Sequence, residues 1–381
     1  MKILAVDIGT GTQDIFLFDS RFSPENGFKM VMPSATMMVR RKIKEATTNR
    51  KPILLTGEIM GGGPSSWAAE AHQKSGLPVY ATPSAARSFN DDLDLVREMG
   101  ISIVSEDEAE KLPSDICRIE MKDFDIRIIS SALANFGVSI ADVDVVAIAV
   151  FDHGNAPRGI SDRKFRFDYL DSRIRQENRL SAFAYPSSQL PADLTRMQAV
   201  ANSCRGIECP VVIMDTAPAA ILGTLFDPKV SNRERNMIIN IGNFHTLAFR
   251  MGAGKIEGVF EHHTGFLNCG KLDSILISLA NGKLNNEMIF ADHGHGALIY
   301  TDGDFPLDDP DFNIVVTGPR RNLLSRSKLK PYFAVPFGDM MLAGCFGLLA
   351  ATADLLPQFS TEILSALNGQ HSDVAPWDSD M

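Results

Sequence analysis

Short apolar runs alternate with glycine-containing polar turns from the first residues of the chain. Residues 3–6 form an apolar run, residues 7–14 read DIGTGTQD, and residues 15–18 form a second apolar run. No helical periodicity follows the polar stretch, so the pattern predicts a β-hairpin and not a strand that leads into a phosphate-binding helix.

The polar turn of this predicted hairpin has the composition of a phosphate clamp. Gly9 and Gly11 carry no Cβ, so their backbone N–H groups can approach a phosphate, and the Thr10 and Thr12 hydroxyls add donors. Asp7 ends the first strand, where its carboxylate is placed to hold Mg²⁺ through water. Glycine turns of this kind also occur in ordinary hairpins, where they serve only turn geometry.

A second copy of the pattern lies at residues 237–250, which read MIINIGNFHTLAFR. This segment again combines an apolar strand, a turn with glycine and threonine, and a returning apolar strand. Two related hairpins about 230 residues apart predict a duplicated architecture, with a ligand held between two similar halves.

Other predicted strands also end in polar or glycine-rich segments. The strand at 52–56 leads into the loop 57–66 and a helix, which form either an anion-accepting helix N-terminus or a capped flexible loop. The strand at 143–151 leads into Asp152 and His153. These two residues would lie at the carboxyl edge of the sheet, where active sites of open α/β proteins collect.

The second half of the chain contains long segments with helical patterns. A helical region is predicted at 165–204, before a strand at 211–214. Two segments rich in small residues, 215–223 and 338–353, are also predicted as helices. Their small side chains allow the two helices to cross closely, as at a hinge, although an ordinary pair of core helices has the same composition.

Composition places the chain among globular proteins of more than one domain. At 381 residues it is too long for one small core, and its 45% hydrophobic and 22% charged residues are typical of globular proteins. Neither an apolar run near the roughly 20 residues of a membrane span nor a signal-peptide pattern is present, so we expect a cytoplasmic protein without membrane contact. The formal net charge of −10 argues against general nucleic-acid binding.

Five cysteines are scattered along the chain. They form neither a CxxC pair nor the CxxxCxxC cluster that holds an iron–sulfur centre for radical chemistry. The cysteine pattern therefore argues against a redox or radical enzyme. We expect these small side chains to lie in the core or beside helices.

Five segments, in this order, resemble the actin, sugar-kinase and heat-shock-chaperone ATPase superfamily, which has a ribonuclease-H-like fold. At finer grain the chain is similar to an uncharacterised family whose members are labelled pyruvate formate-lyase activating proteins. The five segments are 7–14 (phosphate motif one), 215–223 (first connecting helix), 240–246 (phosphate motif two), 313–321 (adenosine motif) and 338–353 (second connecting helix).

The resemblance implies an α/β fold of two ribonuclease-H-like lobes, each a mixed sheet flanked by helices, with a nucleotide cleft between them. It places the first lobe, with phosphate hairpin one, at 1–165. The second lobe, with phosphate hairpin two and the adenosine motif, would occupy 166–337. A connecting helix and a C-terminal helix at 338–365 would return to the first lobe, and 366–381 would form a flexible tail.

The resemblance also implies ATP and Mg²⁺ in the cleft. Asp7 would orient the metal through water, and Asp215 would lie near it. Asp152 would act as a base or orient water, with His153 beside it as a second catalytic candidate. The residues expected to contact the phosphates and the adenosine are Gly9, Thr10, Gly11, Thr12, Gly242, Asn243, Thr246, Gly318 and Pro319.

Six histidines lie beside glycine-containing turns. Imidazole and carboxylate groups that converge from separate loops can bind a transition metal or perform acid–base chemistry near neutral pH. The alternative is a set of polar loop residues that form only local hydrogen bonds. The six are His153, His245, His262, His263, His293 and His295.

Three functions are open at this stage. The first is an ATP-dependent enzyme, a small-molecule kinase or an ATPase, whose acceptor substrate the sequence does not name. The second is a nucleotide-sensing regulator with little turnover and a protein partner; Asn240, which stands where many relatives have an acid, favours it. The third is a metal-dependent hydrolase on the same fold, similar to hydantoinase-type relatives.

Overall fold

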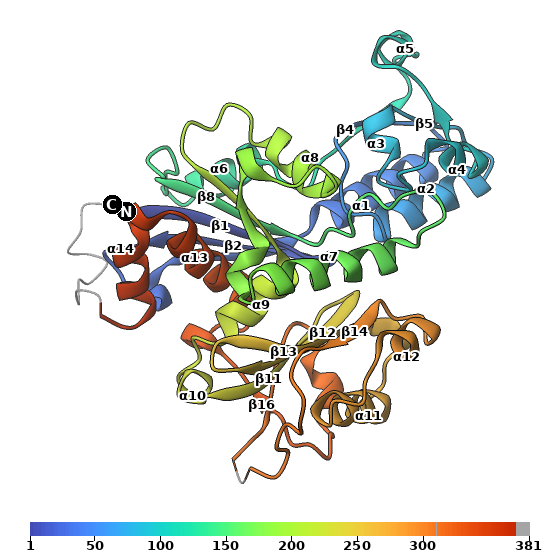
Figure 1. The fold of residues 1–381 in the computed structure, drawn as a ribbon. Coiled ribbons are helices and arrows are strands. Elements are labelled where there is room, and N and C mark those ends of the chain that lie inside the picture. The colour runs from blue at the N-terminus through green and yellow to red at the C-terminus, as the bar shows by residue number, and fades with distance from the viewer. Residues whose placement is uncertain (310, 371–381) are drawn as a thin grey trace.

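Three β-sheets organise residues 1–309 and 311–370, the part of the chain that this computed structural model describes (Figure 1). Two sheets have six strands each, and the third has four. One six-stranded sheet and the four-stranded sheet lie in the upper half of Figure 1, and the second six-stranded sheet lies below them. No helix within these described ranges is long and apolar enough to cross a membrane.

The first six-stranded sheet has the strand order β3-β2-β1-β8-β10-β9. Its central strands are apolar and buried on both faces, because helices cover both sides of the sheet. The predicted first hairpin is confirmed, since β1 and β2 pair antiparallel. The strands are β1 Lys2–Ile8, β2 Thr12–Asp19, β3 Phe28–Pro33, β8 Val145–Val150, β9 Ala184–Pro186 and β10 Val211–Asp215.

The second six-stranded sheet has the order β14-β13-β12-β11-β15-β16. The predicted second hairpin is also confirmed, because β11 and β12 pair antiparallel. Helices again bury both faces of this sheet. The strands are β11 Arg235–Ile241, β12 His245–Gly252, β13 Lys255–His263, β14 Gly296–Ile299, β15 Ile314–Thr317 and β16 Tyr332–Phe333.

The two sheets repeat one topology. In each, three antiparallel strands (β3-β2-β1 and β13-β12-β11) continue into two parallel ones (β8-β10 and β15-β16). Even the hairpin turns match, because the Gly9 N–H donates to the Thr12 carbonyl and the Gly242 N–H donates to the His245 carbonyl, both at 2.9 Å. The predicted α/β fold of two similar lobes with mixed sheets is therefore confirmed.

A separate α/β unit is inserted into the first lobe between β3 and β8. Its parallel sheet has the order β6-β5-β4-β7 and its own apolar core. The sequence analysis predicted a strand at 52–56, which is β4, but not that this region forms a sheet of its own. The elements are α1 Ala35–Thr48, β4 Ile53–Gly57, α2 Pro64–Lys74, β5 Val79–Ala81, α3 Pro83–Ala86, α4 Leu93–Glu98, β6 Ser102–Ile103, α5 Glu106–Lys111 and β7 Cys117–Met121.

The remaining helices cover the two six-stranded sheets and connect the lobes. The predicted helical region 165–204 is wrong in its middle part, because the edge strand β9 interrupts it and pairs with β10. The helices are α6 Ile126–Ala134, α7 Asp162–Gln176, α8 Thr195–Ser203, α9 Thr216–Thr224, α10 Pro228–Ser231, α11 Cys269–Ala280, α12 Asn286–Ala291, α13 Ala343–Leu355 and α14 Pro357–Leu367.

The predicted close crossing of two small-residue helices is observed between α9 and α13. A Cβ on Gly223 would clash with the Ala343 carbonyl, and a Cβ on Gly347 would clash with the Ala219 carbonyl. The backbones therefore touch, and glycine is required at both positions. In Figure 1, α9 lies between the upper and lower sheets.

The C-terminal part of the chain packs against the first lobe. Apolar side chains of α13 and α14 join the core on one face of the first sheet. Residues 366 and 367, predicted as the start of a flexible tail, belong to the last turn of α14. Residues 368–370 follow that helix, and the last part of the predicted tail, 371–381, lies outside the described residues.

Candidate active site

The turns of the two hairpins face each other across a small cavity of about 100 Å³. The sequence had assigned most of these lining residues to the phosphates, and the structure brings them together from both lobes. A Cβ on Gly11 would clash with the Asn243 amide, so the tips of the two turns are in contact. The predicted site residues that line this cavity are Asp7, Gly9, Thr10, Thr12, Gly242, Asn243 and Pro319.

Two residues predicted to contact the nucleotide instead make contacts within the second lobe. The Thr246 hydroxyl is buried and bonds to that of Thr264 at 2.9 Å. Gly318 has a left-handed backbone (φ 95°), and a Cβ there would clash with the side chain of Asn240. Both residues thus shape the wall behind the cavity and do not line it.

Two buried carboxyl groups face each other at the base of the first hairpin. Asp7 and Asp14 are direct partners in the β1–β2 register. Burial raises the pKa of Asp7 to about 7, against a hydrogen bond of 2.5 Å from the Thr216 hydroxyl. Burial and then the charge of Asp7 raise the pKa of Asp14 to about 8. Asp14 Oδ1 has no hydrogen-bond partner among the described residues, so the pair fits a divalent cation.

Asp14 was not among the residues selected from the sequence. The sequence did contain a signal for it. In a hairpin with a two-residue turn, Asp14 on the returning strand lies opposite Asp7, so the two acids share one environment. The sequence analysis described the returning strand but assigned a role only to Asp7 and to residues of the turn. Both carboxyl groups line the small cavity between the hairpins.

Asp215 lies close enough to Asp7 for its charge to add to burial in raising the pKa of Asp7, and its own carboxylate is fully engaged. Its carboxylate accepts hydrogen bonds from Arg166 Nη1 at 2.6 Å and from the Ala217 N–H at 3.0 Å. The first is a fully buried ion pair, and the second caps the N-terminus of α9. Both oxygens are engaged in this way, so Asp7 and Asp14 are the carboxyl groups that remain for a cation.

Both carboxylate oxygens of Asp152 likewise accept hydrogen bonds from backbone N–H groups. The Gly154 N–H donates to Oδ1 at 2.8 Å, and the Met197 N–H donates to Oδ2 at 2.9 Å. Burial raises the pKa of this carboxyl group, and the two N–H donors oppose that rise. These contacts tie the loop after β8 to the first turn of α8, and the role of Asp152 as a base stays a prediction.

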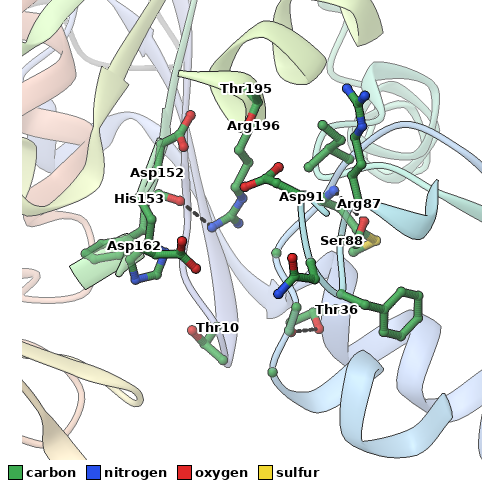
Figure 2. A pocket seen from close by; sticks show the side chains of 18 of the residues that line it. Thr10, Thr36, Arg87, Ser88, Asp91, Asp152, His153, Asp162, Thr195 and Arg196 are labelled. Atoms are coloured by element: carbon green, nitrogen blue, oxygen red, sulfur yellow. Dashed lines mark hydrogen bonds between the residues drawn. The ribbon is translucent and has the colours of Figure 1, made fainter. Parts of the chain in front are cut away.

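A larger cavity, of about 250 Å³, adjoins the hairpin cavity (Figure 2). The first lobe contributes Thr10, His153 and Arg196, and the second lobe contributes Phe244 and His245. The inserted unit closes the opposite side with the glycine-rich loop 61–63 and with Arg87, Ser88 and Asp91. This loop, for which an anion-accepting helix N-terminus and a capped flexible loop were both open, therefore faces a cavity.

Arg196 holds the inserted unit against the first lobe. Its guanidinium donates to both oxygens of Asp123, at 2.7 and 3.1 Å, and to the Phe151 carbonyl at 2.6 Å. Asp123 in turn accepts from the Gly61 N–H at 3.2 Å. This chain of contacts connects the glycine-rich loop to the end of β8, and Arg196 borders both cavities.

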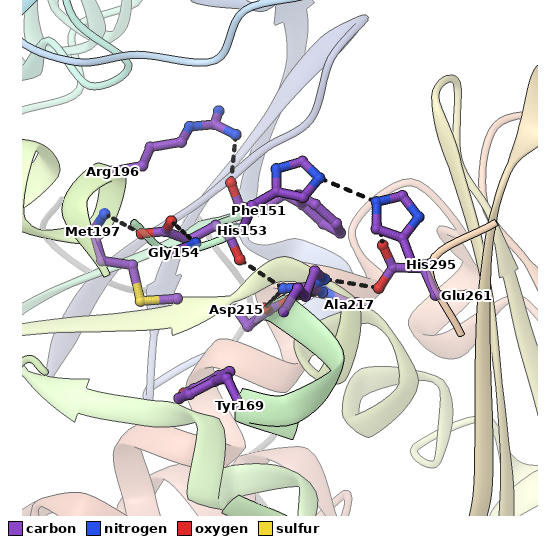
Figure 3. A network of polar contacts seen from close by, with 12 residues as sticks. Phe151, His153, Gly154, Tyr169, Arg196, Met197, Asp215, Ala217, Glu261 and His295 are labelled. Atoms are coloured by element: carbon purple, nitrogen blue, oxygen red, sulfur yellow. Dashed lines mark hydrogen bonds and ion pairs between the residues drawn. The ribbon is translucent and has the colours of Figure 1, made fainter. Parts of the chain in front are cut away.

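Three of the six histidines converge at the point where the lobes meet. His153, in the loop after β8, His245, at the start of β12, and His295, just before β14, each offer one ring nitrogen, and these atoms lie within 4.8 Å of one another. His153 Nε2 is 3.1 Å from His295 Nε2 (Figure 3). Burial and nearby guanidinium groups lower the pKa of His153 to about 3, so its imidazole is neutral at pH 7.

The other three histidines lie around this cluster. The His263 ring is 4.7 Å from that of His295, between ring centroids. His262 instead contacts Asp292, at 3.2 Å. His293 has a left-handed backbone with φ 64°. The prediction that loop histidines converge is thus observed for three, with His263 adjacent.

A buried ion network supports the cluster from behind (Figure 3). Arg166 Nε donates to Glu261 Oε2 at 2.8 Å, and Arg166 Nη1 donates to the Asp152 carbonyl at 2.7 Å. The other oxygen, Glu261 Oε1, is 3.5 Å from His295 Nε2. Burial raises the pKa of Glu261 to about 7, against the charge of Arg166. Arg166 was not singled out from the sequence, whereas Glu261 directly precedes two of the six histidines considered there.

Comparison with known proteins identifies one family. The family model described as "Putative pyruvate format-lyase activating enzyme (DUF1786)" matches residues 60–323, more than half of the chain, which confirms the finer resemblance found in the sequence. The comparison with curated proteins gives no match.

Solved structures share low identity with the chain. The ethanolamine utilization protein EutJ from Carboxydothermus hydrogenoformans is 11% identical over 91% of this chain and 89% of its own, with a TM-score of 0.31. The ROK hexokinase from Thermus thermophilus is 12% identical over 97% and 89%, with a TM-score of 0.24. A ROK family transcriptional regulator, a homologue of the E. coli MLC protein, is 9% identical over 99% and 54%, with a TM-score of 0.25. Similarities of this size bear on neither substrate nor activity.

Proposed function

The chain belongs to the DUF1786 family, and we propose that this member is a nucleotide-dependent enzyme that acts on the terminal phosphate of a magnesium nucleotide. The nucleotide would lie between the two hairpins, and a small-molecule substrate would occupy the adjoining 250 Å³ cavity. One observation carries the proposal: the hairpin turns of two topologically equal lobes meet at one cavity that two buried carboxyl groups also line.

Each part of the hairpin cavity has a distinct task in this proposal. Free backbone N–H groups and hydroxyls of the turns would hold the phosphates, as nests of such donors do for anions. Asp7 and Asp14 would orient Mg²⁺, which neutralises charge on the phosphates. Because the Gly9 and Gly242 N–H groups are engaged within their own turns, the Thr10 and Thr12 hydroxyls are the donors we favour.

The position of Thr10 connects the two cavities. Thr10, Arg196 and His245 line both of them, so a phosphate at this border would face a molecule in the larger cavity. Phosphoryl transfer needs mainly positioning and charge neutralisation, and Arg196 supplies a fixed positive charge there. His153 lines the larger cavity, so its side chain would contact an acceptor molecule there.

The test is a calorimetric titration of tag-free protein with a non-hydrolysable ATP analogue, with and without Mg²⁺. We expect saturable, Mg²⁺-dependent binding to the wild type and roughly 10–100-fold weaker binding to Thr10→Val, which loses one hydrogen bond to a charged group. Thr48→Val, at an exposed site on α1, is the matched control and should bind as the wild type does. Absence of binding at millimolar analogue would overturn the proposal.

A nucleotide sensor with little turnover is the second candidate. The engaged carboxylate of Asp152 favours it, because the residue expected to act as base has no free oxygen. Phosphate release assays separate the two candidates. An enzyme should lose turnover in His153→Asn and retain analogue binding, whereas a sensor should show little turnover in the wild type.

A further inference from the structure

We propose that His153, His245 and His295 bind one divalent transition-metal ion of the zinc class, with an open coordination position toward the 250 Å³ cavity. This site is separate from the carboxyl pair of the hairpin cavity. It rests on three observations: ligand geometry, buried polar atoms without partners, and access.

The geometry is close to that of a three-histidine metal site. Ligand nitrogens at about 2.0–2.1 Å from a tetrahedral zinc ion lie about 3.3 Å from one another. His153 Nε2 and His295 Nε2 already lie 3.1 Å apart, and all three donor atoms lie within 4.8 Å. Small rotations of the His245 ring would therefore complete the set. Imidazole ligands favour zinc, copper, iron and nickel over magnesium or calcium.

Buried polar atoms without hydrogen-bond partners lie at the same place. Within the described residues, His245 Nε2, His295 Nδ1, His263 Nδ1 and Glu261 Oε1 are buried without a hydrogen-bond partner. Buried polar atoms are nearly always satisfied, so the unpartnered His245 Nε2 and Glu261 Oε1 at this place point to a missing ligand. Glu261 Oε1 lies 3.5 Å from His295 Nε2, the nitrogen that faces His153, so it is close enough to accept a proton from water bound to the metal.

The cluster is also reachable. His153 and His245 line the larger cavity, whereas His295 lies behind them and is fully buried. Three protein ligands and one position open to a cavity are the arrangement of catalytic zinc sites, and structural sites are closed by four protein ligands. A metal held here would polarise a carbonyl or phosphoryl oxygen of the molecule in the cavity or activate a bound water.

The experiment titrates Co²⁺ into tag-free protein that has been dialysed against chelator and is free of nucleotide. We expect one equivalent to bind, with the intense visible absorption of four- or five-coordinate Co²⁺, and one equivalent of Zn²⁺ to displace it. His153→Asn, His245→Asn and His295→Asn should each bind at least about 100-fold more weakly, since even supporting residues of metal sites contribute 10–100-fold.

His293→Asn is the matched control. It removes a nearby histidine outside the cluster, and asparagine tolerates the left-handed backbone at that position. Far-UV circular dichroism identifies any variant that fails to fold. Because His245 is only partly buried, His245→Asn still provides the test if His295→Asn does not fold.

The proposal is overturned if Co²⁺ does not bind stoichiometrically, or if the three cluster variants bind it as His293→Asn does. His295 lines neither cavity, so His295→Asn should retain binding of the ATP analogue. Thr10→Val should in turn retain Co²⁺ binding. Failure of the metal site and failure of the nucleotide site are therefore separate results.

Discussion

The guanidinium of Arg166 lies 2.6 Å from the carboxylate of Asp215, and neither side chain has measurable contact with solvent. The same guanidinium pairs with Glu261 in the second lobe and lies 3.8 Å from the ring centroid of Phe151. Arg166 thus joins the two lobes directly behind the histidine cluster. It balances charges that would otherwise be buried alone.

Replacing Arg166 should therefore be severe. Arg166→Met leaves two buried carboxyl groups without their partner, and we expect it to lower the free energy of unfolding by about 3–5 kcal/mol. Arg175→Met, on the same helix α7, breaks only an exposed pair with Asp171 and should change it by less than about 1 kcal/mol. Urea denaturation of both variants measures the difference. Equal losses of unfolding free energy in the two variants would show that the buried ion pairs stabilise the protein no more than an exposed pair does.

Two glycine-to-alanine substitutions in helices should change the free energy of unfolding in opposite directions. Gly347→Ala places a methyl group against the Ala219 carbonyl where α9 and α13 cross, and we expect a loss of about 1–3 kcal/mol. Gly270→Ala, on the exposed side of α11, meets no close atom and should stabilise the protein by about 0.5–1 kcal/mol. Urea unfolding again provides the values. An unchanged free energy of unfolding in Gly347→Ala would mean that α9 and α13 can move apart without loss of stability.

The Asp7–Asp14 pair should make the protein less stable as the pH rises. The folded protein raises the pKa of Asp7 to about 7 and that of Asp14 to about 8, so it holds protons that the unfolded chain, near 3.8, has released. This stabilisation is complete below about pH 4 and is lost as the pH rises through 7 to 8, with a slope of up to about 1.4 kcal/mol per pH unit for each group.

Asp14→Asn should flatten that dependence, because the amide cannot ionise. Unfolding free energies between pH 5 and 8, without divalent cations, provide the test, and Asp302→Asn on the exposed surface is the control. An unchanged slope in Asp14→Asn would assign the pH dependence to other groups.

Asp7 should matter for nucleotide only in the presence of Mg²⁺. Because the proposed role of its carboxylate is to orient the cation, Asp7→Asn should weaken binding of the ATP analogue with Mg²⁺ by at least about 10-fold and change metal-free binding little. Calorimetry with and without Mg²⁺ measures both quantities. Equal losses under the two conditions would remove Asp7 from the metal site and leave it a purely structural carboxyl group.

Local patterns in the sequence were enough to predict the hairpins and hence the two lobes. A hairpin pairs strands that are adjacent in the chain, so β1–β2 and β11–β12 follow from apolar periods and a glycine turn that a short window contains. The small-residue helices were equally readable, because glycine and alanine at close spacing permit the backbone contact seen at Gly223 and Gly347.

Tertiary structure alone decided which polar groups are free to bind a ligand. Asp152 and Asp215 have the residue type and position of site residues, but the Met197 N–H that engages Asp152 and the arginine that engages Asp215 come from other elements. The parallel sheet of the inserted unit depended in the same way on pairings between separate segments. His153 and His295 meet across 142 residues of chain, and no local pattern encodes such a distance. Secondary structure depends on neighbours in sequence, whereas a site depends on how whole lobes pack, and that packing brings these side chains together.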